Sequence, residues 1–368
     1  MMRILFFVLL VIVLLGLALI LYLHHPKFGQ LPEGASLEKV QASPNYRDGE
    51  FKNEVDTLLF ATDQSFMEVL IDNIRADKSG LTPESAIPSE PVNFKTLDPG
   101  RDLVVWLGHS SYYIQINGLR ILLDPVFSQA AAPVAFANRA YEGTTVFAVD
   151  DFPELDLLLI THDHWDHLDY PTVTGLKDKV ARVITPLGVG SYFRGWGFPD
   201  SMIQEGDWYD QFAVSYDVTV LITPARHYSG RMLERRQTLW SGFVLESPER
   251  RMFFSGDSGY GPHFDEIARR FRSFDLVALD QGQYDSRWAN IHMTPEEAAQ
   301  AAEELGAARL LPGHVGKFTL ARQTWDEPFE RMVDAAKGRS YDLLTPVLGT
   351  AVSFDDGEQT LPPHWWRR

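Results

Sequence analysis

The chain has 368 residues, a formal charge of −17 and no cysteine. This length is enough for one large domain with extensions, or for two modest domains. The acidic balance, with no block rich in Lys or Arg, argues against a nucleic-acid partner, because phosphates would be repelled. Without cysteine, disulfides, thiolate ligands and thiol nucleophiles are excluded, so any metal site must use His, Asp and Glu.

The N-terminus carries an apolar run from Ile4 to Leu23. At ~1.5 Å per residue, a helix of this length spans about 30 Å, the thickness of the hydrocarbon core of a bilayer. A cleaved signal peptide is the alternative. The run is longer than such peptides need, however, and the following His24-His25-Pro26-Lys27 offers no cleavage site of small residues. We therefore expect an uncleaved single-pass transmembrane anchor over residues 1–23.

The charges that flank this run bear on its orientation. Arg3 and the amino terminus lie on one side and Lys27 on the other. This bias favours a cytoplasmic N-terminus, which would place the catalytic domain on the exported, periplasmic side of the membrane.

Two segments separate the anchor from the main domain. Residues 24 to about 50 are rich in Pro, Gly and charge, which predicts a tether with little regular structure. Between Phe66 and Arg75, apolar residues recur at helical spacing and predict an amphipathic helix. We therefore divide the chain into an anchor over 1–23, a tether and N-terminal helical extension over 24–95, and a hydrolase domain over 96–368.

From Leu103 onward, strands alternate with isolated helices, which predicts layered α/β packing. Asn117-Gly118 between two apolar runs predicts a hairpin. A predicted helix begins at Thr294-Pro295-Glu296-Glu297, which has an N-cap Thr, a first-turn Pro and a Glu three residues after the cap. The other expected strands lie at 103–107, 157–160, 183–185, 218–223, 242–246, 252–254, 276–279 and 310–311, and the other helices at 262–271 and 328–337.

The most informative stretch is Thr161-His162-Asp163-His164-Trp165-Asp166-His167, which follows the apolar run Leu157–Ile160. The run reads as a buried strand, so these side chains should stand where the strand ends. Imidazole nitrogen and carboxylate oxygen are the ligands that zinc and similar cations favour. A polar surface loop that happens to be rich in His and Asp is the alternative.

Three further residues stand at the ends of predicted strands, namely His227, Asp257 and His314. Each is preceded by Gly or Pro within a few residues, which turns the chain and presents the side chain at the rim of a sheet. Taken singly, a His after a strand is more often a structural hydrogen-bonding residue, and an Asp before a turn is more often a cap. Together with the first cluster, they predict a metal site.

This pattern resembles the metallo-β-lactamase superfamily, whose members carry H-x-H-x-D-H followed by a distant His, Asp and His. More narrowly, the chain resembles the branch of N-acylphosphatidylethanolamine-hydrolysing phospholipase D and its bacterial relatives. The resemblance extends over residues 95 to 335 and includes the segments Trp106–Ser111, Asp124–Ser128, Gly256–Tyr260, Tyr284–Trp288 and His292–Ala298. It implies an αββα sandwich with the site at one edge of two packed sheets.

The resemblance also implies a dinuclear site holding two Zn²⁺ or other divalent ions. The first ion would be held by His162, His164 and His227. The second would be held by Asp166, His167 and His314, and Asp257 would bridge both. A hydroxide shared by the two ions would then be the nucleophile, so no Ser or Cys nucleophile is required.

Other residues of the matching segments are candidates for substrate chemistry. We predict catalytic roles for Asp166, Asp257 and His292, and substrate contacts at His109, Tyr284 and Arg287; for each of His109 and His292, a structural hydrogen bond is the alternative. The expected activity is that of a membrane-anchored phosphodiesterase acting on a phospholipid. The alternatives are a lactonase or other carbonyl-ester hydrolase, and a catalytically silent metal-binding membrane protein. The sequence does not define the oligomeric state.

Overall fold

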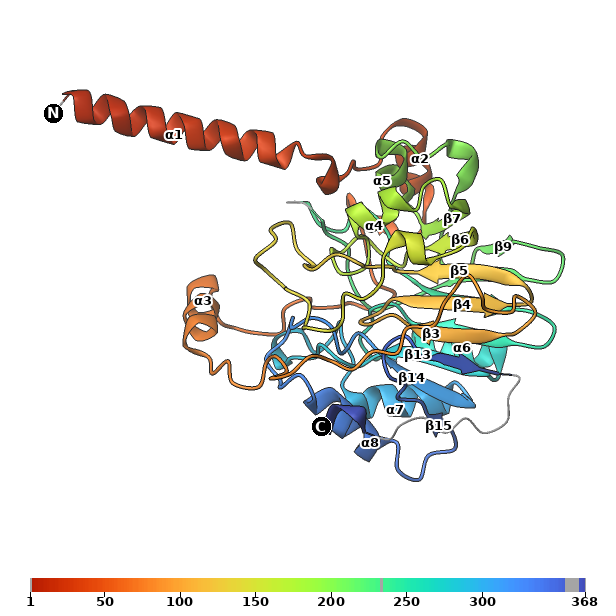
Figure 1. Ribbon diagram of the computed structural model, residues 1–368. Helices are drawn as coiled ribbons and strands as arrows, with labels where there is room; N and C mark the ends of the chain where they lie inside the picture. The colour runs from red at the N-terminus through yellow and green to blue at the C-terminus, as the bar shows by residue number, and fades with distance from the viewer. Residues whose placement is uncertain (1, 232–233, 355–363, 368) are drawn as a thin grey trace.

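The computed structural model describes residues 2–231, 234–354 and 364–367. Two seven-stranded sheets form the body of the protein (Figure 1). The first sheet has the order β16-β3-β4-β5-β6-β7-β8 and the second has the order β15-β14-β13-β12-β11-β10-β9. A large apolar core contains residues of both sheets, such as Val104 and Leu158 of the first and Ile222 and Phe243 of the second. The two sheets therefore pack face to face, as the sandwich prediction requires.

The strands of the first sheet are β3 (Leu103–Trp106), β4 (Tyr112–Ile116), β5 (Leu119–Leu123), β6 (Leu155–Leu159), β7 (Val180–Pro186), β8 (Ile203–Gly206) and β16 (Ala351–Ser353). Those of the second sheet are β9 (Gln211–Ala213), β10 (Thr219–Thr223), β11 (Gly242–Glu246), β12 (Arg251–Phe254), β13 (Leu276–Asp280), β14 (Arg309–Gly313) and β15 (Asp342–Leu343). Within each sheet antiparallel and parallel pairs are mixed: β5, β6, β7 and β8 run parallel, as do β12, β13, β14 and β15.

Helices cover the body and extend from it. They are α1 (Met2–Leu23), α2 (Gly34–Ala42), α3 (Phe66–Arg75), α4 (Tyr170–Gly175), α5 (Gly190–Gly195), α6 (His263–Phe271), α7 (Pro295–Glu304) and α8 (Glu327–Ala335). A second apolar cluster joins Val277 and Leu310 of the second sheet to Ile267 of α6, Ala301 of α7 and Met332 of α8, so these helices cover the outer face of that sheet. Figure 1 shows α1 and α3 projecting from the same side of the body.

Two local predictions are confirmed in detail. Asn117 (φ 47°) and Gly118 (φ 81°) both adopt the left-handed conformation, which a two-residue hairpin turn needs, and they join β4 to β5. At the start of α7, the hydroxyl of Thr294 accepts from the amide of Glu297, whose carboxylate accepts from the amide of Thr294.

The expectation of little regular structure between residues 24 and 50 is wrong. This segment contains α2, and a short hairpin of β1 (Tyr46–Arg47) and β2 (Glu50–Phe51) follows the helix. The reason is burial, because Val40 and Phe51 are enclosed in the same core as the sheets. Although the segment is largely polar, Val40 and Phe51 are therefore enough to pack it against the body.

The strand ends bring the candidate donors to one edge of the sandwich. The His162–His167 turn follows β6, whereas His227, Asp257 and His314 follow β10, β12 and β14. The donors stand directly after the ends of these strands, so the side chains that follow both sheets face a common space.

Candidate metal centre

The turn that carries the first donors is fixed by buried hydrogen bonds. Asp124, at the end of β5, accepts from the amide of Thr161 at 2.8 Å and from its hydroxyl at 2.6 Å. Asp163 points away from the centre and accepts from the hydroxyl of Tyr192 at 2.8 Å and the amide of Gly230 at 2.7 Å. The backbone of the turn is therefore held on two sides before any ligand binds.

One group of donors consists of His162, His164, His227 and Asp257, whose ligand atoms all lie within 4.8 Å of one another. Nε2 of His162 is 3.0 Å from Nδ1 of His164, which is 3.2 Å from Nε2 of His227. Asp257 Oδ2 lies 3.8 Å from Nε2 of His162 and 3.7 Å from Nε2 of His227. Three ring nitrogens and one carboxylate thus converge on one point.

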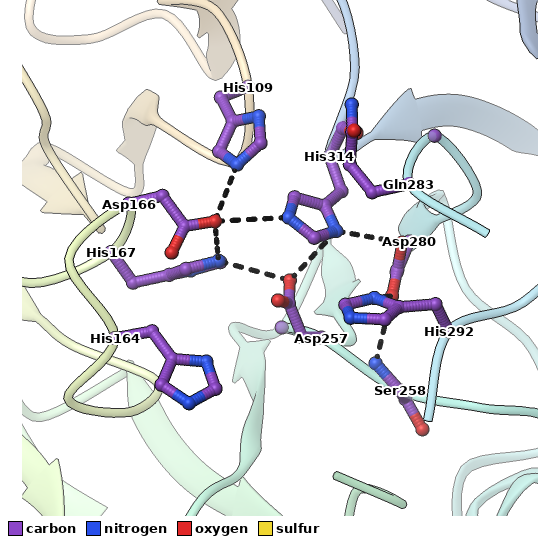
Figure 2. A network of polar contacts seen from close by, with 12 residues as sticks. His109, His164, Asp166, His167, Asp257, Ser258, Asp280, Gln283, His292 and His314 are labelled. Carbon is purple, nitrogen blue, oxygen red and sulfur yellow. Dashed lines mark hydrogen bonds and ion pairs between the residues drawn. The ribbon is translucent and has the colours of Figure 1, made fainter. Parts of the chain in front are cut away.

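A second group consists of His109, Asp166, His167 and His314 (Figure 2). Asp166 Oδ2 lies 2.8 Å from Nε2 of His109 and 3.2 Å from Nε2 of His314. Asp257 connects the two groups, because its Oδ1 lies 3.0 Å from Nε2 of His167 while its Oδ2 faces the first group. The structure therefore brings all seven predicted metal ligands together.

The far nitrogens of the imidazoles bind to groups behind the centre. Nδ1 of His167 lies 2.7 Å from Asp124 Oδ2, and Nδ1 of His314 lies 3.0 Å from Asp280 Oδ1. Nδ1 of His227 donates to the carbonyl of Ile291 at 3.0 Å. Such partners orient an imidazole and select the tautomer whose other nitrogen is free to bind a metal. In all three rings Nε2 is the nitrogen that faces the other candidate ligands.

The pKa shifts of the centre separate neutral imidazoles from imidazoles that are paired with carboxylates. Burial lowers the pKa of His162 and of His227 well below the usual range, which keeps both rings in the neutral, metal-binding form. Burial alone would raise the pKa of Asp257, but the charges of His167 and His314 outweigh burial and hold that pKa well below its usual range. For His314 the direction is reversed: burial lowers the pKa, but the charges of Asp257 and Asp280 outweigh burial and raise the pKa to about 10.

These donors fit divalent cations. Four buried carboxylates surround the centre, and within the described residues their recorded ion pairs are all with histidine; they are Asp124, Asp166, Asp257 and Asp280. Nε2 of His167 and Oδ1 of Asp257 are buried 3.0 Å apart, and neither makes a hydrogen bond of good geometry with any described residue. Buried polar atoms without a well-formed hydrogen bond are costly, and a bound cation would satisfy both of these atoms. Binding would also release the protons that His167 and His314 hold.

Backbone strain gathers at the same place. His109 (φ 56°), Asp124 (φ 43°) and His314 (φ 56°) all adopt the left-handed conformation, which non-glycine residues rarely occupy. The amide of His314 donates to the carbonyl of His109 at 3.2 Å, and the amide of His109 donates to the carbonyl of Val315 at 3.1 Å. These bonds join the two sheets above the centre and hold the strained residues in place.

A cavity of about 310 Å³ opens onto the donors. Six candidate donors line it, and they are His164, Asp166, His227, Asp257, His292 and His314. The walls are largely apolar and include Phe60, Ala131, Trp165, Tyr228, Trp288, Ile291 and Leu320. Polar donors at the base and apolar walls are typical of a site that binds an amphipathic small molecule.

Of the other four predicted site residues, one lines the cavity, one lies behind the metal ligands and two bind elsewhere. His292 lines the cavity, and its Nδ1 lies 2.7 Å from Asp280 Oδ2. His109 is buried behind Asp166. Tyr284 donates to Glu327 at 2.8 Å, and the Arg287 side chain forms two hydrogen bonds to Asp285, and neither residue lines the cavity.

Several functional residues were missed in the sequence. Asp280 contacts both His292 and His314, and it could have been found because it ends a buried apolar strand, as the predicted ligands do. In the sequence, Asp124 stands out only as part of a segment that matches the family. Trp165 and Tyr228 adjoin predicted ligands, but no periodicity in the sequence marks them as walls of a cavity.

The fold and these donors define a class: two packed mixed sheets with histidines and aspartates at one edge, as in the metallo-hydrolases of the metallo-β-lactamase fold. The solved structure of Igni18, a metallo hydrolase from Ignicoccus hospitalis, shares this fold, with a TM-score of 0.54 at 17% identity over 70% of this chain and 99% of that one.

Comparisons of sequence define the family. The model of the beta-lactamase superfamily domain matches residues 119–315. An uncharacterized protein of Mycobacterium tuberculosis is 38% identical over 342 residues, 91% of each chain. N-acyl-phosphatidylethanolamine-hydrolyzing phospholipase D 1 of Caenorhabditis elegans is 26% identical over 302 residues, 78% of this chain and 83% of the relative. The chain belongs to the beta-lactamase superfamily and is a metal-dependent hydrolase, as its sequence predicted.

Proposed function

We propose that this protein is a membrane-anchored, dinuclear phosphodiesterase that acts on a phospholipid in the manner of N-acylphosphatidylethanolamine phospholipase D. The observation that carries the proposal is the convergence of two donor groups on Asp257 at the base of a largely apolar cavity. The similarity to the nematode phospholipase supports the choice of a phosphodiester substrate.

Two Zn²⁺ ions suit the donor set, because zinc binds both imidazole nitrogen and carboxylate oxygen. His162, His164 and His227 would hold one ion, and Asp166, His167 and His314 the other. Asp257 lies between the groups with one oxygen toward each. When bound, such a pair lowers the pKa of water and neutralises charge on the attacked and leaving oxygens.

The chain's own residues supply orientation and proton handling. Asp280 accepts from Nδ1 of His292 at 2.7 Å, which leaves Nε2 as the ring atom that can contact a ligand in the cavity. We assign Nε2 of His292 the role of holding a proton for the leaving oxygen of the phosphodiester. Trp165 and Tyr228 exclude water from one side of the cavity and give an acyl or glyceryl group an apolar wall.

Membrane anchoring rests on α1. The helix segment Arg3–Leu23 is long and apolar enough to cross a bilayer, with a mean hydropathy of 3.5, and none of that window is buried against the body. The flanking charges favour a catalytic domain on the periplasmic side. An anchored enzyme meets a lipid substrate at a high effective concentration.

The test is a turnover panel on the purified full-length protein in detergent, with metal content measured in parallel. We expect hydrolysis of N-acylphosphatidylethanolamine or another phospholipid phosphodiester, and about two zinc ions per chain. Turnover of lactones with intact phosphodiesters would replace the proposal by a carbonyl-ester hydrolase. A folded protein without metal and without turnover on any substrate would favour a catalytically silent protein.

A further inference from the structure

A short, partly exposed loop between β5 and β6 has an unusual composition for an acidic protein. Residues 130–137 read Ala-Ala-Ala-Pro-Val-Ala-Phe-Ala, with no charged or polar side chain. The loop closes on itself, because the amide of Ala131 donates to the carbonyl of Asn138 at 3.0 Å and Ala130 pairs with Arg139. Phe136 is 81% exposed, so a large aromatic side chain lies in solvent at the tip of the loop.

The same loop is fastened to the end of the apolar helix. The carbonyl of Pro133 accepts from the hydroxyl of Tyr22, in the last turn of α1, at 2.5 Å. It also accepts from Nζ of Lys27 at 2.7 Å, and that ammonium lies 4.3 Å from the centre of the Tyr22 ring. Tyr and Lys at the end of an apolar helix are typical of the membrane–water interface. If α1 spans a bilayer, Pro133 therefore lies at the depth of the interface.

The loop is also a wall of the catalytic cavity. Ala131 and Asn138, at its base, line the cavity together with Trp165. The chain just after α1 supports Trp165 as well, because the ring of Phe28 packs against it edge-on with 5.5 Å between ring centres. Arg231 stacks on Trp165 at 3.8 Å and donates to the carbonyl of Lys27 at 2.8 Å. The segment that leaves the helix thus contacts two walls of the cavity.

We propose that residues 130–139, the Phe136 loop, insert their apolar tip into the surface of a lipid bilayer beside α1. This inference rests on the proposed membrane anchoring and extends it. Residues 130–137 of the loop carry no charge, and an exposed phenylalanine gains free energy when it leaves water for the acyl boundary, as interfacial aromatic residues do. Arg139, which is exposed at the base, is placed to meet lipid phosphates.

The consequence concerns how substrate arrives. Because Ala131 and Asn138 line the cavity, docking of the loop holds the mouth of the cavity against the lipid surface. A lipid headgroup would then reach the donors without the whole molecule leaving the bilayer. We therefore infer that the Phe136 loop binds a bilayer. The alternative, which the experiment below tests, is that it binds a second copy of the chain.

The absence of cysteine makes a labelling experiment direct. Phe136→Cys would carry an environment-sensitive fluorophore in the full-length protein, reconstituted in phosphatidylcholine vesicles with or without lipids brominated near the carbonyl end of the acyl chain. Leu21→Cys, 75% exposed in the last turn of α1, reports anchoring. Tyr216→Cys, fully exposed between β9 and β10, is the matched control away from α1 (Figure 1).

We expect a blue shift and a loss of emission at position 136 comparable to those at position 21, with no change at position 216. Quenching at position 21 without quenching at position 136 would overturn the loop proposal and leave the anchor intact. No quenching at position 21 would overturn the anchoring and the loop proposal together. A shift at position 136 that appears in detergent and grows with protein concentration would indicate a second copy of the chain instead of lipid.

Discussion

The metal centre and the mouth of the cavity are built in different ways. At the centre, His167, His227, Asp257 and His314 follow strands of the sandwich and are buried, and the far nitrogens of His167 and His314 lie against buried carboxylates. The mouth is made of segments from distant parts of the chain, such as Phe60, Ala131 and Trp288. Rigid strand ends fix the chemistry, whereas connecting segments determine what reaches it.

The largest effect is expected at the shared carboxylate. Asp257→Asn removes the negative charge that faces both donor groups while preserving the shape of the side chain. We expect turnover to be abolished, metal content to fall and the circular dichroism spectrum to remain that of the folded protein. Near-normal turnover in this variant would mean that the ligand assignment is wrong.

The next effect tests the groups behind the centre. Asp280→Asn weakens the partner of both His292 and His314 without touching the first donor group. Mutation of a hydrogen-bond partner of a metal ligand typically lowers metal affinity or activity by about 10- to 100-fold, and we expect a loss of that size in metal affinity or kcat. Asp265→Asn, an exposed change in the first turn of α6, is the control and should change neither quantity. Equal behaviour of the two variants would contradict the orienting role of Asp280.

A pH effect is expected from His263, which is buried behind the centre with Nε2 3.0 Å from Oγ of Ser258. Burial, and then the charge of Arg226, lower its pKa to about 3. Below the usual pKa of about 6.5, the unfolded chain binds a proton that the folded chain does not, so stability falls as pH falls from about 6.5 toward 3. Between pH 6.5 and 5 the free energy of unfolding should fall by about 2 kcal/mol because of His263, since one pKa unit corresponds to about 1.4 kcal/mol.

His263→Gln should therefore flatten the pH dependence of the free energy of unfolding, measured by urea titration at pH 6.5 and 5. The exposed His24→Gln variant should retain the slope of the parent protein. Identical slopes for all three proteins would show that His263 is not held neutral by the fold.

The smallest effect is expected at the mouth. Trp165→Phe keeps an aromatic wall but loses contact area and part of the stacking on Arg231. About 1 kcal/mol of lost apolar contact corresponds to a roughly fivefold higher KM for a lipid substrate, with kcat and metal content nearly unchanged. A loss in kcat at constant KM would place Trp165 in the chemistry of the centre and would weaken the contrast between the two regions.

The sequence was sufficient to predict the regions where local rules decide the structure. The β4–β5 hairpin follows from Asn117-Gly118, and the start of α7 follows from its capping box, because both signals act over a few residues. The ligand-rich turn after β6 could be located because an apolar strand and a cluster of imidazoles adjoin in the chain. Superfamily membership followed from the same residues, and the comparisons confirm it.

What the sequence could not predict depends on contacts between distant segments. Asp280 becomes important only because β13 places it beside His292 and His314. The α2 segment is ordered by a core that forms mainly from later residues, including those around Phe51. Tyr284 and Arg287 lie in a matching segment, yet their side chains pair with Glu327 and Asp285, which no local pattern indicates.

The most direct test of the whole account is an anomalous-diffraction map of the purified protein at the zinc edge, combined with metal analysis. We expect about two zinc ions per chain, one peak among His162, His164 and His227, and a second among Asp166, His167 and His314, with Asp257 between them. A folded, metal-replete crystal with no peak at this edge of the sandwich would contradict it.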